Sequence, residues 1–398
     1  MNPAGVVSDT STLARVVERF GAADRYAIDT EFHRERSYYP KLALVQLADH
    51  QGTVIIDPLA VDASPLAEVM AGPGLAVAHA AEQDLEVMEL ACGAIPSHLF
   101  DTQVAAGFLG LSTPSLASLV ERVIGERLPK ASRLADWLRR PLTDEQVRYA
   151  GADVDHLLTL AAELEERLDE VGRIDWARQE CELLRMRRRG PAPVEEAWLR
   201  LRECRSLRGP ARGVAQEVAA WREQTAALRD RPVRSVLSDL AVLSIAQQPP
   251  RDEQQLRQRR GVDGRHLGGE ATERILAAVE RGQTLPKTEV RVPPHSGVDA
   301  ALRPAVTLVS AWLSQLGRDL AIAPATLATR ADIEAFLRGD DDARLATGWR
   351  GDLVGELIRR LVDGEVALAF AGDGRLALEA RSGQTITVEL PVPDVDWS

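Results

Sequence analysis

The chain has 398 residues, of which 45% are hydrophobic and 27% are charged, and its net charge is −12. These values exclude a disordered, collagen-like or membrane-embedded chain, and the length predicts two or three domains. No apolar run approaches the roughly 18 residues of a spanning helix, and the first residues lack a secretory signal pattern. The three cysteines are far apart in sequence, which fits a reducing compartment. We therefore expect a cytoplasmic protein that does not contact a membrane.

The first part of the chain alternates strand and helix patterns. Three short apolar runs follow one another through short turns, as hairpin strands do, and a fourth comes later. These runs lie at 25–32, 42–48, 53–57 and 75–78. Apolar residues at helical spacing then predict helices at 85–91, 102–109, 116–124 and 144–171. The expected fold is an α/β domain with a mixed sheet and surrounding helices.

Strand signals stop near residue 195 and helical patterns replace them. The helices of 198–282 are interrupted at Gly209-Pro210, Pro232, Pro249-Pro250 and Gly261, and those of 301–364 at Pro324 and an acidic loop, 339–342. Two helical units of similar size are typical of a duplicated module. The tail, from residue 366, contains short apolar runs separated by glycines and predicts a β-meander. The predicted divisions are 1–195 (α/β domain), 196–283 (first helical domain), 284–300 (linker), 301–365 (second helical domain) and 366–398 (β-rich tail).

Charge is distributed unevenly along this acidic chain. Residues 1–190 hold 20 basic and 30 acidic residues, whereas 198–282 holds 16 basic and 11 acidic residues. An acidic protein repels phosphate at long range, but a basic segment can bind it locally. The arginines of 198–282 therefore indicate either a phosphate-binding face or a solvated helix surface.

Asp29 and Glu31 lie at the end of the first predicted strand. The two-residue period of a strand places both carboxylates on one face, where they repel each other unless a cation or a proton lies between them. Hard divalent ions such as Mg²⁺ suit such a pair. The alternative interpretation is a solvated strand end.

Two further acidic positions follow in the same domain. Asp84 opens a predicted helix, either as a functional carboxylate or as a first-turn acid that the helix dipole favours. Tyr149 and Asp153 are four residues apart and share one helix face, either as a site pair or as a buried tyrosine beside an exposed acid. Together, the four carboxylates can converge on two cations, as in metal-assisted phosphodiester cleavage.

The motifs in this order resemble the DEDD exonuclease superfamily, in its tyrosine-bearing branch, and most closely the ribonuclease D family. The matching stretches cover most of residues 25–160 and read IDTEFHRERSYYPKLALVQLAD, IIDPLA, HAAEQDLEVM, FDTQVAA and DWLRRPLTDEQVRYAGADVDHLL. The helical units resemble the domain that RecQ-type helicases share with ribonuclease D (HRDC), and GWRGDLVG at 348–355 fits the second copy.

The resemblance implies a ribonuclease-H-like fold with two divalent cations, Mg²⁺ or Mn²⁺. Asp29 would bridge both ions, Glu31 and Asp153 would hold the ion that activates water, and Asp84 would support the other. Tyr149 would position the water.

The same resemblance suggests supporting residues. Lys130 and Trp137 match substrate-end positions, and Asp101 occupies a position expected to support the site from behind. Arg34 and Arg36 follow the Asp-x-Glu strand and are further candidates for substrate contact, or belong to a solvated loop.

The sequence leaves the roles of three further aromatic residues undecided. Tyr38 and Tyr39 are either base-stacking or core aromatics. His79 lies five residues before Asp84, as a catalytic histidine does before the last aspartate of the other superfamily branch. Residue 148, five before Asp153, is an arginine, so we expect His79 to be a packing residue.

The predicted function is a metal-dependent 3′→5′ exoribonuclease that releases nucleoside 5′-monophosphates from RNA with a single-stranded 3′ end. The resemblance suggests tRNA precursors and small stable RNAs as substrates and a monomeric enzyme. The alternatives are a DNA 3′→5′ exonuclease on the same scaffold, a non-catalytic RNA-binding adaptor and a structural metal-binding domain.

Overall fold

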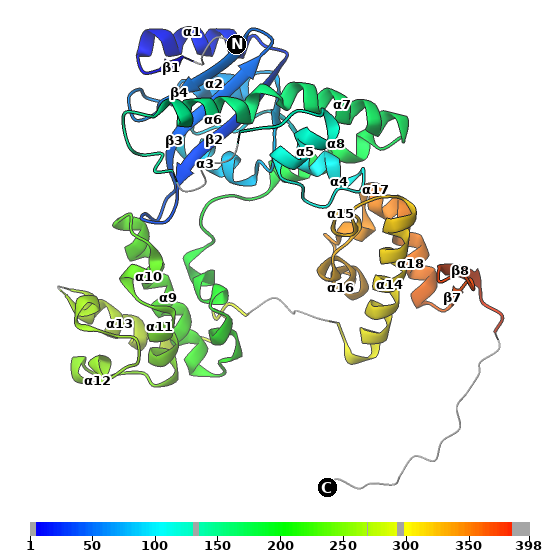
Figure 1. Ribbon diagram of the computed structural model, residues 1–398. Coiled ribbons are helices and arrows are strands. Elements are labelled where there is room, and N and C mark those ends of the chain that lie inside the picture. The colour runs from blue at the N-terminus through cyan, green and yellow to red at the C-terminus, as the bar shows by residue number, and fades with distance from the viewer. Residues whose placement is uncertain (1–4, 130–134, 269, 293–297, 384–398) are drawn as a thin grey trace. The chain divides into compact units, whose positions relative to one another are not determined.

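The computed structural model describes residues 5–129, 135–268, 270–292 and 298–383. It divides into two compact units, one formed by residues 1–106 and 113–294 and the other by residues 107–112 and 295–398. The first unit contains the predicted α/β domain and the basic helical segment (Figure 1).

A six-stranded mixed sheet forms the centre of the α/β domain. Its strand order is β1-β4-β3-β2-β5-β6. β2, β3 and β4 are antiparallel neighbours, as the short connections predict, whereas β5 and β6 run parallel to β2 and β1 runs parallel to β4. The strands are β1 (Val6–Val7), β2 (Arg25–His33), β3 (Lys41–Asp49), β4 (Gly52–Ile56), β5 (Leu75–Ala78) and β6 (His98–Asp101).

Helices cover both faces of this sheet (Figure 1). Val45 and Leu47 of β3 pack on one face with Leu13 and Leu85 of the covering helices. Leu44 and its neighbours on the other face pack against the helix that carries Tyr149 and Asp153. The helices are α1 (Thr10–Gly21), α2 (Leu66–Ala71), α3 (Glu82–Cys92), α4 (Thr102–Gly107), α5 (Leu116–Val123), α6 (Asp144–Asp155), α7 (Leu157–Glu170) and α8 (Ile174–Met186).

Several predicted boundaries in this domain need correction. The single helix predicted over 144–171 is two helices, because the chain breaks at His156 between α6 and α7. β1 and β6 were not predicted; β1 has only two residues, too few for a periodic pattern to show, and β6 has four. No prediction covered α1, α2 or α8, although α1 buries Leu13, Val16, Val17 and Phe20 at helical spacing.

The basic segment folds into helices around the buried Trp198. The predicted interruptions are confirmed: α9 begins at Pro210, α10 follows Pro232, and α11 ends before Pro249-Pro250. Gly261, after α12, has a φ of +82°, which a side chain would strain. The elements are η1 (Val194–Arg200), η2 (Arg202–Ser206), α9 (Pro210–Leu228), α10 (Val233–Val236), α11 (Asp239–Gln247), α12 (Glu253–Arg257), η3 (Gly264–Leu267) and α13 (Ala271–Thr284).

The second unit is a helical bundle followed by a β-hairpin. Phe108 packs edge-to-face on Trp349, with 5.1 Å between ring centroids, and the Arg350 guanidinium donates to the backbone of Leu327 at 3.0 Å. The elements are η4 (Ala300–Leu302), α14 (Arg303–Asp319), α15 (Pro324–Leu327), α16 (Arg330–Arg338), η5 (Arg344–Ala346), α17 (Gly348–Arg350), η6 (Gly351–Gly355), α18 (Glu356–Val362), β7 (Val366–Phe370) and β8 (Leu376–Ala380).

The predicted β-meander is therefore a two-stranded antiparallel sheet in the described part of the tail. The third predicted strand, within 385–391, lies outside the described residues.

Candidate active site

The first two carboxylates of the candidate site lie on β2. Asp29 and Glu31 face Gln46 and Leu44 on the neighbouring strand β3. The pairing shifts between Glu31 and Phe32, so the strand is irregular just after the second carboxylate. Paired residues of antiparallel strands share one face, and Leu44 belongs to the cluster that packs against α6. Both carboxylates therefore lie on the α6 side of the sheet.

Asp84 comes from the first turn of α3, as predicted. Its Oδ1 atom accepts a hydrogen bond from the hydroxyl group of Thr30, the residue between Asp29 and Glu31. The Asp-x-Glu strand is thus linked directly to α3. Sequence reasoning missed Thr30, although its position within the motif was a signal that could have identified it.

Tyr149 and Asp153 lie on α6, which contacts β2, β3 and β4. A capping box fixes the start of this helix: the Thr143 hydroxyl accepts from the Gln146 backbone, and the Gln146 side chain accepts from the Thr143 backbone. The Tyr149 ring packs against Trp137 with 5.9 Å between centroids. The i, i+4 spacing thus turns the phenol and the carboxylate toward the strand that carries Asp29.

The four carboxylates are buried close enough to affect one another's protonation. Burial and the charges of Asp84, Asp153 and Glu31 raise the pKa of Asp29 well above its ordinary value. Burial, followed by Asp153 and Asp84, raises the pKa of Glu31 to about 8. Burial raises the pKa of Asp84 to about 6, although the Thr30 hydrogen bond opposes the shift.

The pKa of Asp153 is also raised. Burial raises its pKa to about 7, and a hydrogen bond from Tyr149 acts in the opposite direction. Burial and the neighbouring carboxylates raise the pKa of the Tyr149 phenol, so the hydroxyl keeps its proton at neutral pH. Tyr149 is therefore a hydrogen-bond donor in this site.

Oxygen ligands and negative charge are the features that hard divalent cations require, and these residues supply both. Among the described residues, however, no three His, Cys, Asp or Glu side chains are gathered as a ready-made metal site. The residues fit a cation by chemistry and charge.

A hollow of about 650 Å³ opens beside this cluster. Its lining includes Glu31 and Tyr149 of the cluster, together with Arg34, Arg36 and Trp137. The Arg34 guanidinium forms an ion pair with Glu86 at 2.5 Å. Trp137 is only 8% exposed, so it supports Tyr149 as well as lining the hollow. The structure thus brings three of the four predicted substrate contacts together, and Lys130 lies outside the described residues.

The segment that carries Trp137 is fixed by an arginine that sequence reasoning missed. The Arg140 guanidinium donates two hydrogen bonds of 2.6 Å to Asp57 at the end of β4. It also donates to the backbone oxygens of Trp137 and Ala43. The Asp in IIDPLA and the Arg-Arg-Pro in the last motif were the available signals.

Asp101 supports the site from behind. Its carboxylate accepts hydrogen bonds from the backbone N–H groups of Ala80 and Ala81, which immediately precede α3. It also accepts from Gln103 and Val104 at the start of α4. Asp101 therefore holds the turn that places Asp84.

His79 has a partner at each ring nitrogen. Nδ1 lies 2.9 Å from the Thr102 hydroxyl group, and Nε2 lies 3.1 Å from the backbone oxygen of Pro114. Burial lowers the pKa of the imidazole. Both nitrogens are thus used within the fold.

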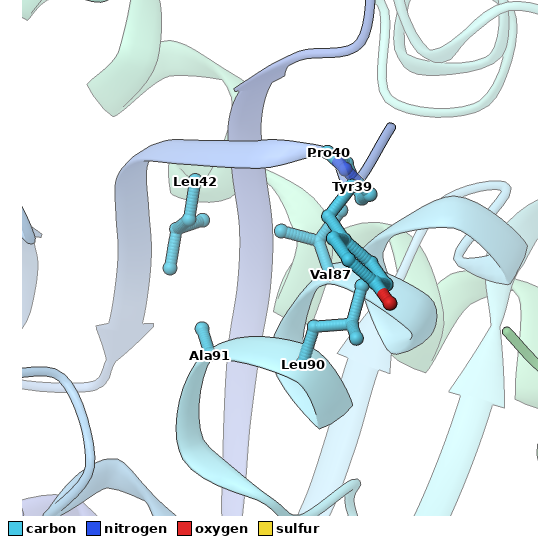
Figure 2. Close-up of a pocket in the computed structure, with 6 residues that line it drawn as sticks. All are labelled: Tyr39, Pro40, Leu42, Val87, Leu90 and Ala91. Atoms are coloured by element: carbon cyan, nitrogen blue, oxygen red, sulfur yellow. The ribbon is translucent and has the colours of Figure 1, made fainter. Parts of the chain in front are cut away.

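The two adjacent tyrosines differ in their surroundings. The Tyr38 hydroxyl donates to Glu223 at 2.8 Å and its ring packs against the core around Trp198. Tyr39 is 38% exposed and lines an apolar hollow of about 360 Å³ with Pro40 and Leu42 and, on α3, Val87, Leu90 and Ala91 (Figure 2). Of the two rings, Tyr39 is the one available to a ligand.

None of the described helices is long and apolar enough to cross a membrane.

Comparison with known families matches two separate parts of the chain. A family of 3′-5′ exonuclease domains matches residues 5–169, and the HRDC domain family matches residues 211–279. Exonucleases of this kind depend on metal ions.

Whole-chain relatives extend the match. Ribonuclease D of Nitrobacter hamburgensis is 38% identical over 95% of this chain and all of its own length. Ribonuclease D of Zymomonas mobilis is 35% identical over 94% of this chain and 97% of its own length. The crystal structure of Escherichia coli RNase D, described as an exoribonuclease involved in structured RNA processing, has a TM-score of 0.83 and 33% identity over 92% of this chain and 99% of that one. This chain therefore belongs to the ribonuclease D family of 3′→5′ exoribonucleases.

Proposed function

We propose that Asp29, Glu31, Asp84 and Asp153 hold two divalent cations, Mg²⁺ or Mn²⁺, and form the catalytic site together with Tyr149. The observation that carries this proposal is that β2, α3 and α6 bring four buried carboxyl groups together. Burial first, and then the charges of Asp84, Asp153 and Glu31, raise the pKa of Asp29. Buried carboxyl groups placed in this way are stable either with bound protons or with bound cations. At neutral pH, the cation-bound form is the one that supports hydrolysis.

Within this set, Asp29 would contribute to holding both cations, Glu31 and Asp153 would hold the cation that activates water, and Asp84 would support the other. When bound, the cations would supply an activated water and positive charge for the leaving 3′-oxygen.

Tyr149 has a separate task. Its hydroxyl keeps its proton and donates to Asp153, which supports a role in orienting the attacking water. This role puts the chain in the tyrosine branch of the superfamily. The product of each cycle is one nucleoside 5′-monophosphate.

The substrate is RNA with a single-stranded 3′ end. Arg34 and Arg36 line the hollow beside Glu31 and offer positive charge to the phosphates there, and Trp137 lies against the terminal nucleotide. Lys130 is a further proposed contact. A base upstream of the terminal nucleotide stacks in the apolar hollow of Tyr39, because the two hollows share α3 and the β2–β3 connection.

The helical parts hold the body of a structured RNA such as a tRNA precursor. The basic composition of 198–282 supports this role. We assign 196–283 as the first HRDC-like domain, 284–300 as a linker, 301–365 as a second HRDC-like domain and 366–398 as a β-rich tail. We further propose that the protein is a monomer. The three unpaired cysteines support a cytoplasmic location, where thiols stay reduced.

The test is a time course on 5′-labelled single-stranded RNA with Mg²⁺, with DNA of the same sequence and the Asp29→Asn variant in parallel. We expect a ladder that shortens from the 3′ end for the wild type on RNA, no ladder for the variant, and loss of activity in EDTA that Mg²⁺ or Mn²⁺ restores. Activity that persists in excess chelator, or in the Asp29→Asn variant, contradicts the proposed site. Equal rates on DNA contradict the proposed RNA preference.

A further inference from the structure

Gln46 lies in the middle of β3 and its side chain is fully buried. Neither Oε1 nor Nε2 has a hydrogen-bond partner among the described residues. A buried amide without partners destabilises a fold, whereas a methionine or leucine of similar size would not carry this penalty. The sheet therefore contains a polar side chain that packing alone does not explain.

The register of the sheet shows what this amide faces. Gln46 pairs with Asp29 on β2 and with Ile55 on β4. Side chains of directly paired residues lie on the same face, with Cβ atoms about 4.5–5.5 Å apart. Ile55, Leu44 and Ala150 on this face form an apolar cluster. Asp29 is thus the polar side chain directly across from Gln46.

We propose that Gln46 is a positioning residue whose Nε2 amide donates a hydrogen bond to the Asp29 carboxylate in the cation-bound enzyme. This inference rests on the proposed cation site. A carboxylate that binds two cations still has unused lone pairs, and a donor from the protein fixes which way its oxygens point.

The fold explains why such a donor is needed here. Asp84 has Thr30 as its donor and Asp153 has Tyr149. Asp29 has a hydrogen bond with the backbone of Thr30, and among the described residues no side chain donates to it. Gln46 supplies a side-chain donor to the carboxylate that we expect to bind both cations.

The experiment compares Gln46→Met with the wild type as full-length, EDTA-stripped proteins. Methionine keeps the length of the side chain and removes its donor. Calorimetric titration with Mg²⁺, and separately with Mn²⁺, measures cation affinity, and urea unfolding in EDTA measures stability. Steady-state hydrolysis of a labelled RNA gives kcat and KM. Gln46→Leu repeats the test with a second apolar side chain.

Gln216→Met is the matched control. Gln216 is also buried, but its Nε2 donates to the backbone oxygen of Glu289 at 3.2 Å and its Oε1 accepts from Arg291 at 2.8 Å. We expect this control to lower stability and to leave cation affinity unchanged.

For Gln46→Met we expect the reverse: cation affinity and kcat fall about 10–100-fold, as for other residues that support metal ligands. KM changes less than about threefold, and the cation-free protein is as stable as the wild type or more so. Wild-type cation affinity in both Gln46 variants overturns the inference. A loss of kcat that only follows a loss of folded protein also overturns it. If wild type and Asp29→Asn bind the cations equally, the proposed cation site itself fails.

Discussion

Replacing Glu31 with glutamine tests the electrostatics of the site without any substrate. The folded protein raises the pKa of Glu31 from 4.5 to about 8, first through burial and then through Asp153 and Asp84. Between these two pH values, the folded state holds a proton that the unfolded chain releases. The free energy of unfolding therefore decreases as the pH rises from about 4.5 to about 8. The Glu31→Gln variant has no titrating proton at this position, so its free energy of unfolding does not include this part of the decrease with pH.

The size of the effect follows from the shift. At about 1.4 kcal/mol per pKa unit, a folded-state pKa of about 8 corresponds to about 5 kcal/mol above pH 8. Rearrangement of the carboxyl groups and entry of water reduce this value in practice. We expect the stability of Glu31→Gln, relative to the wild type, to increase by about 2–4 kcal/mol between pH 5 and pH 8.

Urea unfolding of the full chain in EDTA, across this pH range, measures the difference. Pulse labelling of β2 and β3 by hydrogen exchange ensures that the transition observed belongs to the α/β domain. Glu35→Gln is the control, because Glu35 is an exposed acid on the connection after β2. Mg²⁺ should stabilise the wild type more than Glu31→Gln, since a ligand stabilises the state that binds it. A stability difference that does not change with pH would refute the clustering of carboxylates described above.

Three further substitutions test separate parts of the molecule. Tyr149→Phe should lower kcat at least 10-fold and leave KM within about twofold if the hydroxyl holds the attacking water; an unchanged kcat in the RNA assay would leave Tyr149 only its packing against Trp137. Asp101→Ala leaves four backbone N–H groups without an acceptor and should lower the free energy of unfolding, measured with urea, by about 3 kcal/mol. Asp101→Asn should lower it less. A loss below about 1 kcal/mol in Asp101→Ala would argue against a supporting role for this residue. Tyr39→Ala should raise KM at least about 5-fold for a long single-stranded RNA but not for a dinucleotide, as expected for a lost base stack; an equal effect on both substrates would contradict stacking in the apolar hollow.

The sequence was most informative where chemistry and periodicity coincide. The antiparallel β2–β4 arrangement, the helix starts after Gly209 and Pro232 and the position of Asp84 in a first turn are all confirmed. The comparisons confirm the family and the exoribonuclease activity. The β2–β4 arrangement, the helix starts and the motif residues depend on local patterns, which a single sequence displays.

Features that depend on tertiary contacts were missed. The break at His156 lies within continuous helical periodicity, so no local signal marks it. The partner of Asp57 is 83 residues away, and Gln46 looks like any polar residue of a strand until its register with Asp29 is known. The roles of Asp29, Glu31, Asp84, Tyr149 and Asp153, and of their substrate-contacting neighbours, stay predictions.

The structure separates two kinds of buried acid that the sequence presents alike. Asp49 and Asp57 each lie at the end of a strand and each pair with an arginine, Arg19 or Arg140, which helps to hold their pKa values below the ordinary range. Such pairs are neutral overall and need nothing further from solution.

The carboxylates of the candidate site have no such partner. The causes that act on Asp29, Glu31 and Asp153 are burial, one another's charges and neutral hydrogen-bond donors, and no arginine is among them. Arg34 and Arg36 line the hollow beside Glu31, and Arg34 pairs with Glu86. Arginines neutralise Asp49 and Asp57 within the fold, whereas the carboxylates of the candidate site need protons or cations from solution. At neutral pH, divalent cations meet that requirement and protons meet it only in part.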